Sequence, residues 1–279
     1  MQLTLLGTGG PRPDPQRHAA ATMVQIDNQS LLFDTGRGVV LQCVRAGIAL
    51  EHVNPIFLTH HHYDHIGDLA DVILTSWLLG REQPLKIFGP PGTTAIVHAL
   101  LQQIYDKDIA FRLHEQQRPW PPVECTDVMS GLVYDSGQWR VYTEVVMHGH
   151  GIDFPAAFAH RWVCLGYRLE ADGKVVTISG DCVACEGLNV LARDADALVQ
   201  CCYLARSELT TPAMQRLAQE TLACADTVGK IARQACVKQL VLTHFRQKPE
   251  EALQEIAADV AQDYDGPVVL GKDLTGVLV

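Results

Sequence analysis

Histidines and carboxylates gather in one short stretch of the chain. His60, His62, Asp64 and His65 fall within six residues and follow an apolar run over residues 55–58 that we expect to be a buried strand. Imidazole and carboxylate groups are ligands of Zn²⁺ and similar metals. Residues two apart on an extended segment point the same way, so His60 and His62 can bind one ion. Asp64 and His65 come after a turn and can face a second ion.

A histidine run also has a simpler interpretation, as a solvated loop or a purification tag. This run is internal, is followed by acidic residues at Asp64 and Asp68, and has an apolar lead-in. A tag needs none of these features, and a surface loop does not need a buried strand before it. We therefore favour the metal site, on a loop at a strand end.

The elements around this loop alternate between strands and helices. Apolar or alternating runs predict strands at 3–6, 23–26, 31–33, 139–147, 163–169, 174–178, 197–200 and 239–242. Helical spacing predicts helices at 39–46, 68–79, 94–105, 211–222, 225–235 and 249–262. This order favours an α/β fold with two sheets packed face to face and helices outside.

Composition bounds the class of protein. The chain has 279 residues, 47 % of them apolar, and a formal net charge of −10, which disfavours nucleic acid as a partner. The N-terminus lacks the pattern of a signal peptide, and no apolar run is long enough to span a membrane. Nine scattered cysteines, an odd number, suggest reduced thiols. We therefore expect a cytoplasmic protein.

Several motifs carry a resemblance to a known family. The stretch from Thr59 to His65, Thr-His-His-His-Tyr-Asp-His, resembles the signature of the metallo-β-lactamase-fold hydrolases. The runs Leu5-Leu6-Gly7-Thr8-Gly9, Leu32-Phe33-Asp34-Thr35-Gly36 and Phe88-Gly89-Pro90-Pro91-Gly92-Thr93 resemble its ribonuclease Z and arylsulfatase-like branch. The resemblance implies an αββα sandwich, and ligands in both halves of the chain favour a single domain over residues 1–279.

The resemblance also implies three later metal ligands, in the order His, Asp, His. His148 closes an alternating strand, Asp181 follows Ser179 and Gly180, and His244 lies in Leu-Thr-His-Phe. His150 is the alternative to His148, because strand ends are uncertain by a few residues.

The implied centre holds two divalent metal ions, most simply Zn²⁺, with Fe or Mn as alternatives. His60, His62 and His148 would bind one ion, Asp64, His65 and His244 the other, and Asp181 would bridge them. Asp64 would also orient a metal-bound hydroxide as a catalytic residue. Asp34, at a strand end, is expected to support the histidine loop.

The substrate is less constrained. Ribonuclease Z proper carries a glycine-rich arm, a histidine and a glutamate that this chain lacks, since Ala225 and Cys201 occupy the matching places. With the acidic balance, this predicts hydrolysis of a small carboxylic ester, lactone, sulfate ester or cyclic phosphodiester. The alternatives are a ribonuclease Z-like nuclease and a non-catalytic metal carrier.

Residues that flank the motifs are the expected substrate contacts: His150, His160, Arg161, Trp162 and Trp77. Residues 152–162 form either a lid lined by aromatic side chains or a loop that packs on the core. The irregular residues 106–122 form either a surface excursion or a flap or dimer contact over the metal site. A homodimer is expected.

Overall fold

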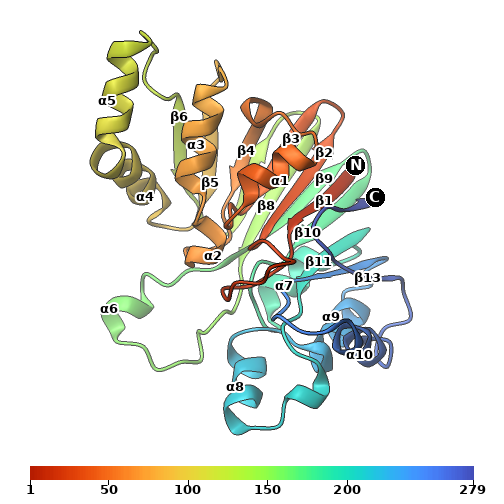
Figure 1. Cartoon of the computed structure of the whole chain (residues 1–279). Helices are drawn as coiled ribbons and strands as arrows, with labels where there is room; N and C mark the ends of the chain where they lie inside the picture. The colour runs from red at the N-terminus through yellow and green to blue at the C-terminus, as the bar shows by residue number, and fades with distance from the viewer.

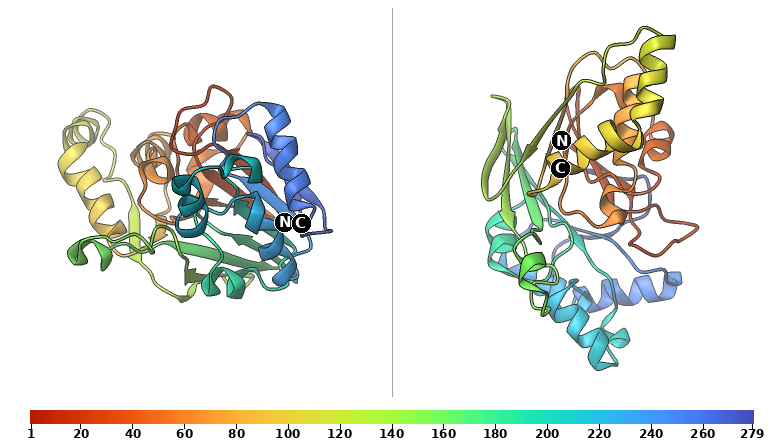
Figure 2. Two further views of the ribbon diagram at one scale, coloured as in Figure 1. Left: turned by 90° about the horizontal axis from the view of Figure 1, so that it is seen from below. Right: turned by 90° about the vertical axis from the view of Figure 1, so that its left-hand side faces the viewer.

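Two seven-stranded sheets lie face to face, and helices cover their outer sides (Figures 1 and 2). The structure is a computed structural model that describes all residues, 1–279. The predicted α/β class and its four-layer αββα sandwich are confirmed. Both chain ends lie side by side, because the first and last strands pair.

The first sheet contains the N-terminal strands. Its order is β14-β1-β2-β3-β4-β5-β6, and the strands from β3 to β6 run parallel. Their bounds are Thr275–Leu278 (β14), Gln2–Gly7 (β1), Ala21–Ile26 (β2), Gln29–Phe33 (β3), Val53–Phe57 (β4), Leu85–Gly89 (β5) and Val123–Asp127 (β6). Parallel strands end at the same edge, so the loops after β3 and β4 meet there.

The second sheet has the order β13-β12-β11-β10-β9-β8-β7, with β10 to β13 parallel. Its strands are Val268–Leu270 (β13), Leu240–Thr243 (β12), Ala197–Cys201 (β11), Lys174–Ile178 (β10), Leu165–Ala171 (β9), Trp139–Val145 (β8) and Gly131–Asp135 (β7). The loops after β10 and β12 therefore also emerge at one edge.

Helices form the outer layers. The first half contributes α1 (Val39–Arg45), the 3₁₀ turn Leu50–His52, α2 (Tyr63–Ile66), α3 (Leu69–Leu78), α4 (Thr93–Ala99), a π-helix (Leu100–Ile104) and α5 (Asp106–Glu115). The second half contributes α6 (Ala156–Ala159), α7 (Glu186–Ala192), the 3₁₀ turn Arg206–Glu208, α8 (Pro212–Glu220), α9 (Ala225–Gln234) and α10 (Glu250–Val260). The apolar faces of these layers pack on the outer faces of the sheets.

A shared core joins the two sheets. Phe57 stacks on Phe33 with ring centroids 5.1 Å apart, and Tyr167 of the facing sheet lies 5.4 Å from Phe57. The first buried residue of this core along the chain is Leu3, and the last is Val277. Because one core takes side chains from both ends of the chain, we infer that residues 1–279 form one domain.

The structure differs from the sequence-based expectation at several elements. Residues 106–115, expected to be irregular, form α5, whose first turn is acidic and whose last turn is basic, as the helix dipole favours. This helix buries only Ile109 and so lies at the surface. Strands β6 and β7 and helix α7 were not predicted. No helix is long and apolar enough to cross a membrane.

Candidate metal centre

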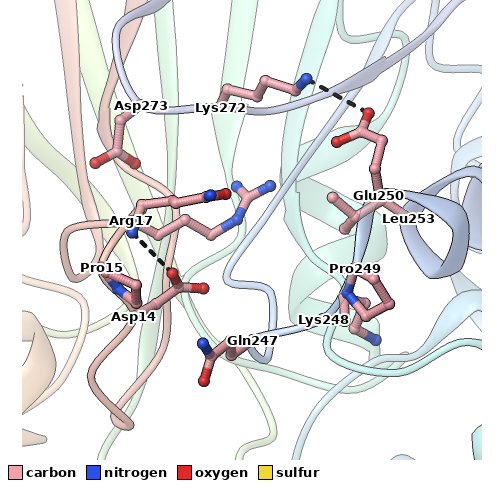
Figure 3. Close-up of a pocket in the computed structure, with 11 residues that line it drawn as sticks. Asp14, Pro15, Arg17, Gln247, Lys248, Pro249, Glu250, Leu253, Lys272 and Asp273 are labelled. Carbon is pink, nitrogen blue, oxygen red and sulfur yellow. Dashed lines mark hydrogen bonds and ion pairs between the residues drawn. The ribbon is translucent and has the colours of Figure 1, made fainter.

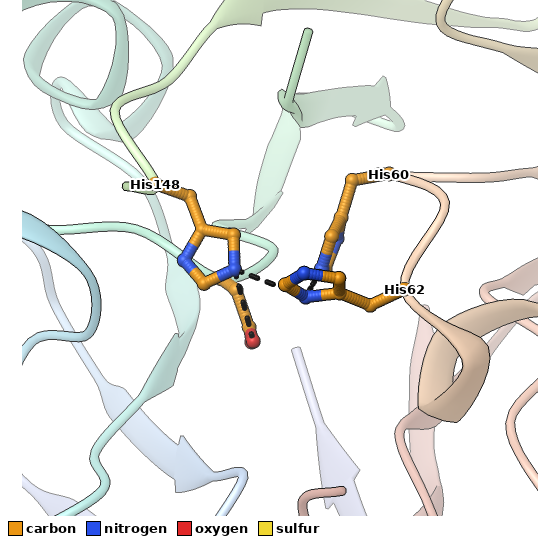
Figure 4. Close-up of side chains that lie close together, drawn as sticks. His60, His62 and His148 are labelled. Atoms are coloured by element: carbon orange, nitrogen blue, oxygen red, sulfur yellow. Dashed lines mark hydrogen bonds and ion pairs between the residues drawn. The ribbon is translucent and has the colours of Figure 1, made fainter. Parts of the chain in front are cut away.

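Three histidines converge from the loops after β4 and β8 (Figure 4). The Nδ1 atom of His62 lies 3.0 Å from Nε2 of His60 and 3.2 Å from Nε2 of His148. Three ring nitrogens thus face one point, where their lone pairs can bind a single cation. Of the two candidates on the later loop, the structure brings His148 to this cluster.

A second cluster joins α2 to the end of β12. Nε2 of His244 lies 3.4 Å from Nε2 of His65 and 3.3 Å from Oδ2 of Asp64. All three side chains are buried. The short helix α2 turns Asp64 and His65 away from the direction of His60, so one loop serves both clusters.

Asp181 connects the clusters. Its Oδ2 atom lies 3.2 Å from Nε2 of His244, 3.5 Å from Nε2 of His65 and 3.9 Å from Nε2 of His148. Gly180 has a φ of 60°, and a Cβ there would come within 2.9 Å of Leu165 O and of Thr59 Cβ. Only glycine fits this left-handed turn, which aims Asp181 at the centre.

Hydrogen bonds on the far side orient the ligands. Oδ2 of Asp34 accepts from Nδ1 of His65 at 2.8 Å, as expected for a supporting carboxylate. Nδ1 of His148 donates to Thr221 O at 2.6 Å, and Nδ1 of His60 lies 3.0 Å from Thr59 Oγ1. Each contact occupies Nδ1 and leaves Nε2 free to face a cation.

The first cluster is electrostatically suited to a metal. Burial lowers the pKa of His60, His62 and His148. Burial and the neighbouring histidines together bring the pKa of His62 to about 4. These imidazoles are therefore neutral near pH 7, which is the form that binds metals.

The second cluster attracts positive charge. Burial alone would lower the pKa of His65 and His244, but Asp181 and other carboxylates outweigh it and raise the pKa of both. The same contacts hold the pKa of Asp181 well below its ordinary value, although burial opposes them. Buried carboxylates and imidazoles in this arrangement fit a divalent cation, which is a candidate cofactor here.

A cavity of about 310 Å³ opens onto the clusters. Its walls combine ligand candidates with mostly apolar side chains: Pro11, His62, Tyr63, Asp64, His148, Asp181, Tyr203, Leu217, Thr221, Leu222 and His244. A volume of this size is typical of small binding sites. A substrate group placed in this cavity would meet both clusters.

Two of the predicted substrate contacts lie beside the cluster. The Nδ1 atom of His150 accepts a hydrogen bond from the His148 backbone at 3.0 Å, so His150 shapes the loop that carries His148. Trp162 donates its indole N–H to His148 O at 2.6 Å, and its ring centroid lies 4.9 Å from that of His62. Phe158 stacks on Trp162 at 5.6 Å, which places the aromatic lining of residues 152–162 against the histidines.

The structure does not bring the other predicted contacts to the cavity. Trp77 lies on the buried face of α3, is 2 % exposed and donates its N–H to Pro119 O. Its expected substrate role is wrong, because the apolar face of α3 turns toward the sheet. His160 and Arg161 lie exposed after α6, outside the cavity lining.

Tyr203 and Thr221 line the cavity and were missed as site residues. Tyr203 lies just beyond the carboxyl end of β11, as Asp181 and His244 lie beyond the ends of β10 and β12, so a search for polar residues after strand ends could have found it. Thr221 acts through its backbone carbonyl, and any residue type supplies that group. No side-chain pattern could have identified it.

A larger polar hollow of about 740 Å³ lies between the loop of Asp14 and the start of α10 (Figure 3). Its charged side chains already have partners in the protein. Lys272 pairs with Glu250 at 3.4 Å, Asp273 accepts from Thr8 at 2.8 Å, and Arg17 donates to Gly271 O at 2.7 Å. These side chains are therefore engaged with one another and with the backbone.

The sandwich and its histidine-aspartate centre define a class of protein. Residues 29–245 match the family described as the beta-lactamase superfamily domain, and the chain belongs to this family. It is thus a hydrolase of the metallo-β-lactamase fold, a fold whose centre takes divalent metal ions.

Particular relatives refine this class. The chain is 33 % identical to Ribonuclease Z of Mycobacterium bovis over 291 residues, covering 100 % of this chain and 98 % of that one. It is 35 % identical to Ribonuclease Z of a Mycobacterium species (strain KMS) over 290 residues, covering 100 % and 96 %. The crystal structure of the short form of human tRNase Z has a TM-score of 0.73 and 21 % identity, covering 100 % and 99 %.

These relatives correct three expectations. Hydrolysis of a small-molecule ester as the main function is contradicted by full-length relatives that are named as ribonucleases. The expectation that nucleic acid is an unlikely partner is contradicted by the same finding. The arylsulfatase-like part of the resemblance is not supported, whereas the ribonuclease Z part is. The net charge of the chain was a poor guide to this partner, because a polyanion responds to the local charge around its binding site.

Proposed function

We propose that this chain is a metal-dependent phosphodiesterase that cleaves RNA, with precursor transfer RNA as the first substrate to test. The observation that carries the proposal is the 33–35 % identity to Ribonuclease Z over the whole chain. The convergent clusters support it, because a nuclease of this class needs a complete hydrolytic centre.

The donor set suits two divalent ions, for which we propose Zn²⁺. His60, His62 and His148 would hold one ion, and Asp64, His65 and His244 the other, with Asp181 between them. When bound, such ions lower the pKa of water from 15.7 toward roughly 7 and so supply a hydroxide nucleophile.

The chain's own residues would orient this chemistry. The pKa of Asp64 is lowered, because hydrogen bonding and charge from His244 and His65 outweigh burial. Asp64 is therefore ionised at neutral pH, and its carboxylate can accept a hydrogen bond from the attacking water. Asp34 would keep His65 in one tautomer, and Trp162 would brace the His148 loop.

The departures from the ribonuclease Z pattern leave this centre intact. Cys201 is 1 % exposed and accepts a hydrogen bond from the Cys182 backbone, and Ala225 is buried at the start of α9. Neither residue lines the cavity. Their replacement therefore removes groups beside the centre without altering the ligands.

The test is cleavage by purified protein loaded with Zn²⁺. We expect a precursor transfer RNA with a 3′ extension to be cut, and bis(p-nitrophenyl) phosphate to be hydrolysed more slowly. His65→Ala should lose one metal ion and reduce both activities by roughly 10²-fold or more, because a two-metal site then lacks half its charge. Ile104→Ala, at an exposed position in the outer layer, is the matched control.

The contrasting substrates are p-nitrophenyl acetate, p-nitrophenyl sulfate and several lactones. Turnover of any of these with no RNA cleavage would refute the proposal. Full RNA cleavage by His65→Ala after loss of its metal would refute the two-metal assignment.

A further inference from the structure

The cavity that opens onto the two clusters carries charge only on the ligand candidates. No lysine or arginine lines it. Its other walls are mostly apolar or aromatic: Pro11, Tyr63, Tyr203, Leu217 and Leu222, with Thr221. A phosphate in this cavity can therefore meet positive charge only at the proposed metal ions, and the rest of the cavity suits an uncharged group.

Tyr63 contributes to this cavity a ring that the protein holds in place. It is the first residue of α2 and is 58 % exposed. Its hydroxyl donates to Pro11 O at 2.6 Å, and the guanidinium carbon of Arg37 lies over the ring, 5.7 Å from its centroid. Because these contacts already orient the ring, a ligand that stacks on its exposed part has little side-chain entropy to remove.

The apolar wall of the cavity is tied to the loop that carries His148. Leu217 lies in α8, and Leu222 comes two residues after this helix ends. Thr221, which precedes Leu222, accepts through its carbonyl a hydrogen bond from Nδ1 of His148 at 2.6 Å. The N–H of Gly149 donates to the carbonyl of the last residue of α8 at 2.7 Å. The wall therefore has a set position beside the metal centre, and the cavity is formed before a ligand binds.

We propose that Tyr63, Leu217 and Leu222 form a subsite that binds a nucleobase of the RNA next to the cleaved phosphate, with the base stacked on the Tyr63 ring. The inference rests on the proposed ribonuclease function and names the part of the substrate that this cavity would take. In RNA the base is the uncharged group with apolar faces, whereas a second phosphate would find no basic side chain in the lining. Stacking accepts every base, because each has a π-face, so the subsite would hold the strand over the metal centre without reading its sequence.

The test measures binding without cleavage. Zn²⁺-loaded protein is titrated by calorimetry with a dinucleotide whose single linkage is a methylenephosphonate, which keeps its charge and resists hydrolysis. Four forms are compared: with both bases, without the 5′ base, without the 3′ base and with neither. The variants are Tyr63→Leu, which removes the ring, and Tyr63→Phe, which removes only the hydroxyl. Tyr105→Leu, at a 39 % exposed tyrosine of the outer helical layer, is the matched control.

We expect removal of one of the two bases to weaken binding to the wild type about 10-fold, as for the loss of one stacked base. Tyr63→Leu should weaken binding of the intact dinucleotide by a similar factor. It should cause no further loss for the form that lacks that base, because the ring then has nothing to stack on. Tyr63→Phe should stay within about 3-fold of the wild type, because the ring remains. Tyr105→Leu should leave all four affinities unchanged.

Two results would overturn the subsite. One is a Tyr63→Leu variant whose affinity changes by the same factor for all four forms, or for none. The other is a wild-type affinity that depends on neither base, or no measurable binding of any form. If the base dependence followed Tyr63 but the wild type cleaved no RNA, the subsite would stand and the proposed function would fail. RNA cleavage without any base dependence in the dinucleotides would support the proposed function and remove the subsite.

Discussion

The carboxylate of Asp34 holds His65 from the side opposite the proposed metal. Its Oδ2 accepts from Nδ1 of His65 at 2.8 Å, and its Oδ1 accepts from the Thr59 backbone at 2.7 Å. A carboxylate only accepts hydrogen bonds, so Nδ1 of His65 carries a hydrogen, and in the neutral imidazole that binds a metal Nε2 keeps its lone pair. One residue at the end of β3 thus sets the tautomer of a ligand and the start of the histidine loop.

Asp34→Asn is expected to lower the affinity for the second metal about 10- to 100-fold, because an amide can present its N–H to His65 and favour the wrong tautomer. Competition with a chromophoric chelator measures this. Asp34 has a φ of 62°, a conformation that asparagine adopts readily, so the substitution changes the chemistry and not the backbone. Asp27→Asn, with a φ of 49° in an exposed turn, is the matched control, and an equal effect there would contradict the assignment.

The metal content of variants should separate the roles of His148 and His150. His148→Gln should reduce the metal content from two ions per chain to one, because Nε2 of His148 faces the first cluster. His150→Gln should keep both ions, because His150 only accepts a hydrogen bond from the His148 backbone. Elemental analysis of the purified variants decides this, and metal loss confined to His150→Gln would reverse the assignment.

Trp162 ties residues 152–162 to the metal loop. Trp162→Phe keeps an aromatic ring near His62 but removes the N–H that binds His148 O. Loss of this hydrogen bond should lower the free energy of unfolding by about 1 kcal/mol. The decrease should be larger if the His148 carbonyl is left without a hydrogen bond. Urea unfolding measures the change, and Trp120→Phe, at a half-exposed ring, should be neutral. Equal stability of both variants would show that the contact contributes nothing.

We expect the contribution of Asp196 to the free energy of unfolding to depend on pH. Burial raises its pKa, but hydrogen bonds from Lys238 at 2.9 Å and from the Val175 backbone at 2.9 Å outweigh burial and lower it from 3.8. Because the folded protein binds this proton less readily than the unfolded chain, the stabilisation is complete above pH 3.8 and is lost as the pH falls through the folded pKa.

The free energy of unfolding of Asp196→Asn should therefore lie below that of the wild type at pH 7, and the gap should narrow below about pH 4. Denaturant titrations across this range measure the gap. The exposed Asp172→Asn should show no gap at any pH. A gap for Asp196→Asn that stays constant down to pH 2 would contradict the ionic origin.

Much of the fold could be predicted because its strands are short apolar runs bounded by glycine, proline or polar residues. Strands β4, β10 and β12 were expected near their observed bounds. Strands β6 and β7 were missed, since Val123–Asp127 and Gly131–Asp135 are edge strands with mostly exposed side chains and little alternation. Trp77 was misplaced because sequence proximity to the histidine loop does not give the face of a helix.

By itself, the sequence determined the ligand types and their places at strand ends, because imidazole and carboxylate spacing is a local property. It could not decide between His148 and His150, which are two residues apart and differ only in what lies across the cavity. Only the tertiary structure brings Asp181 to both clusters and places Tyr203 beside His244. These contacts join residues more than 30 positions apart, and their distances depend on how two sheets pack rather than on any local pattern.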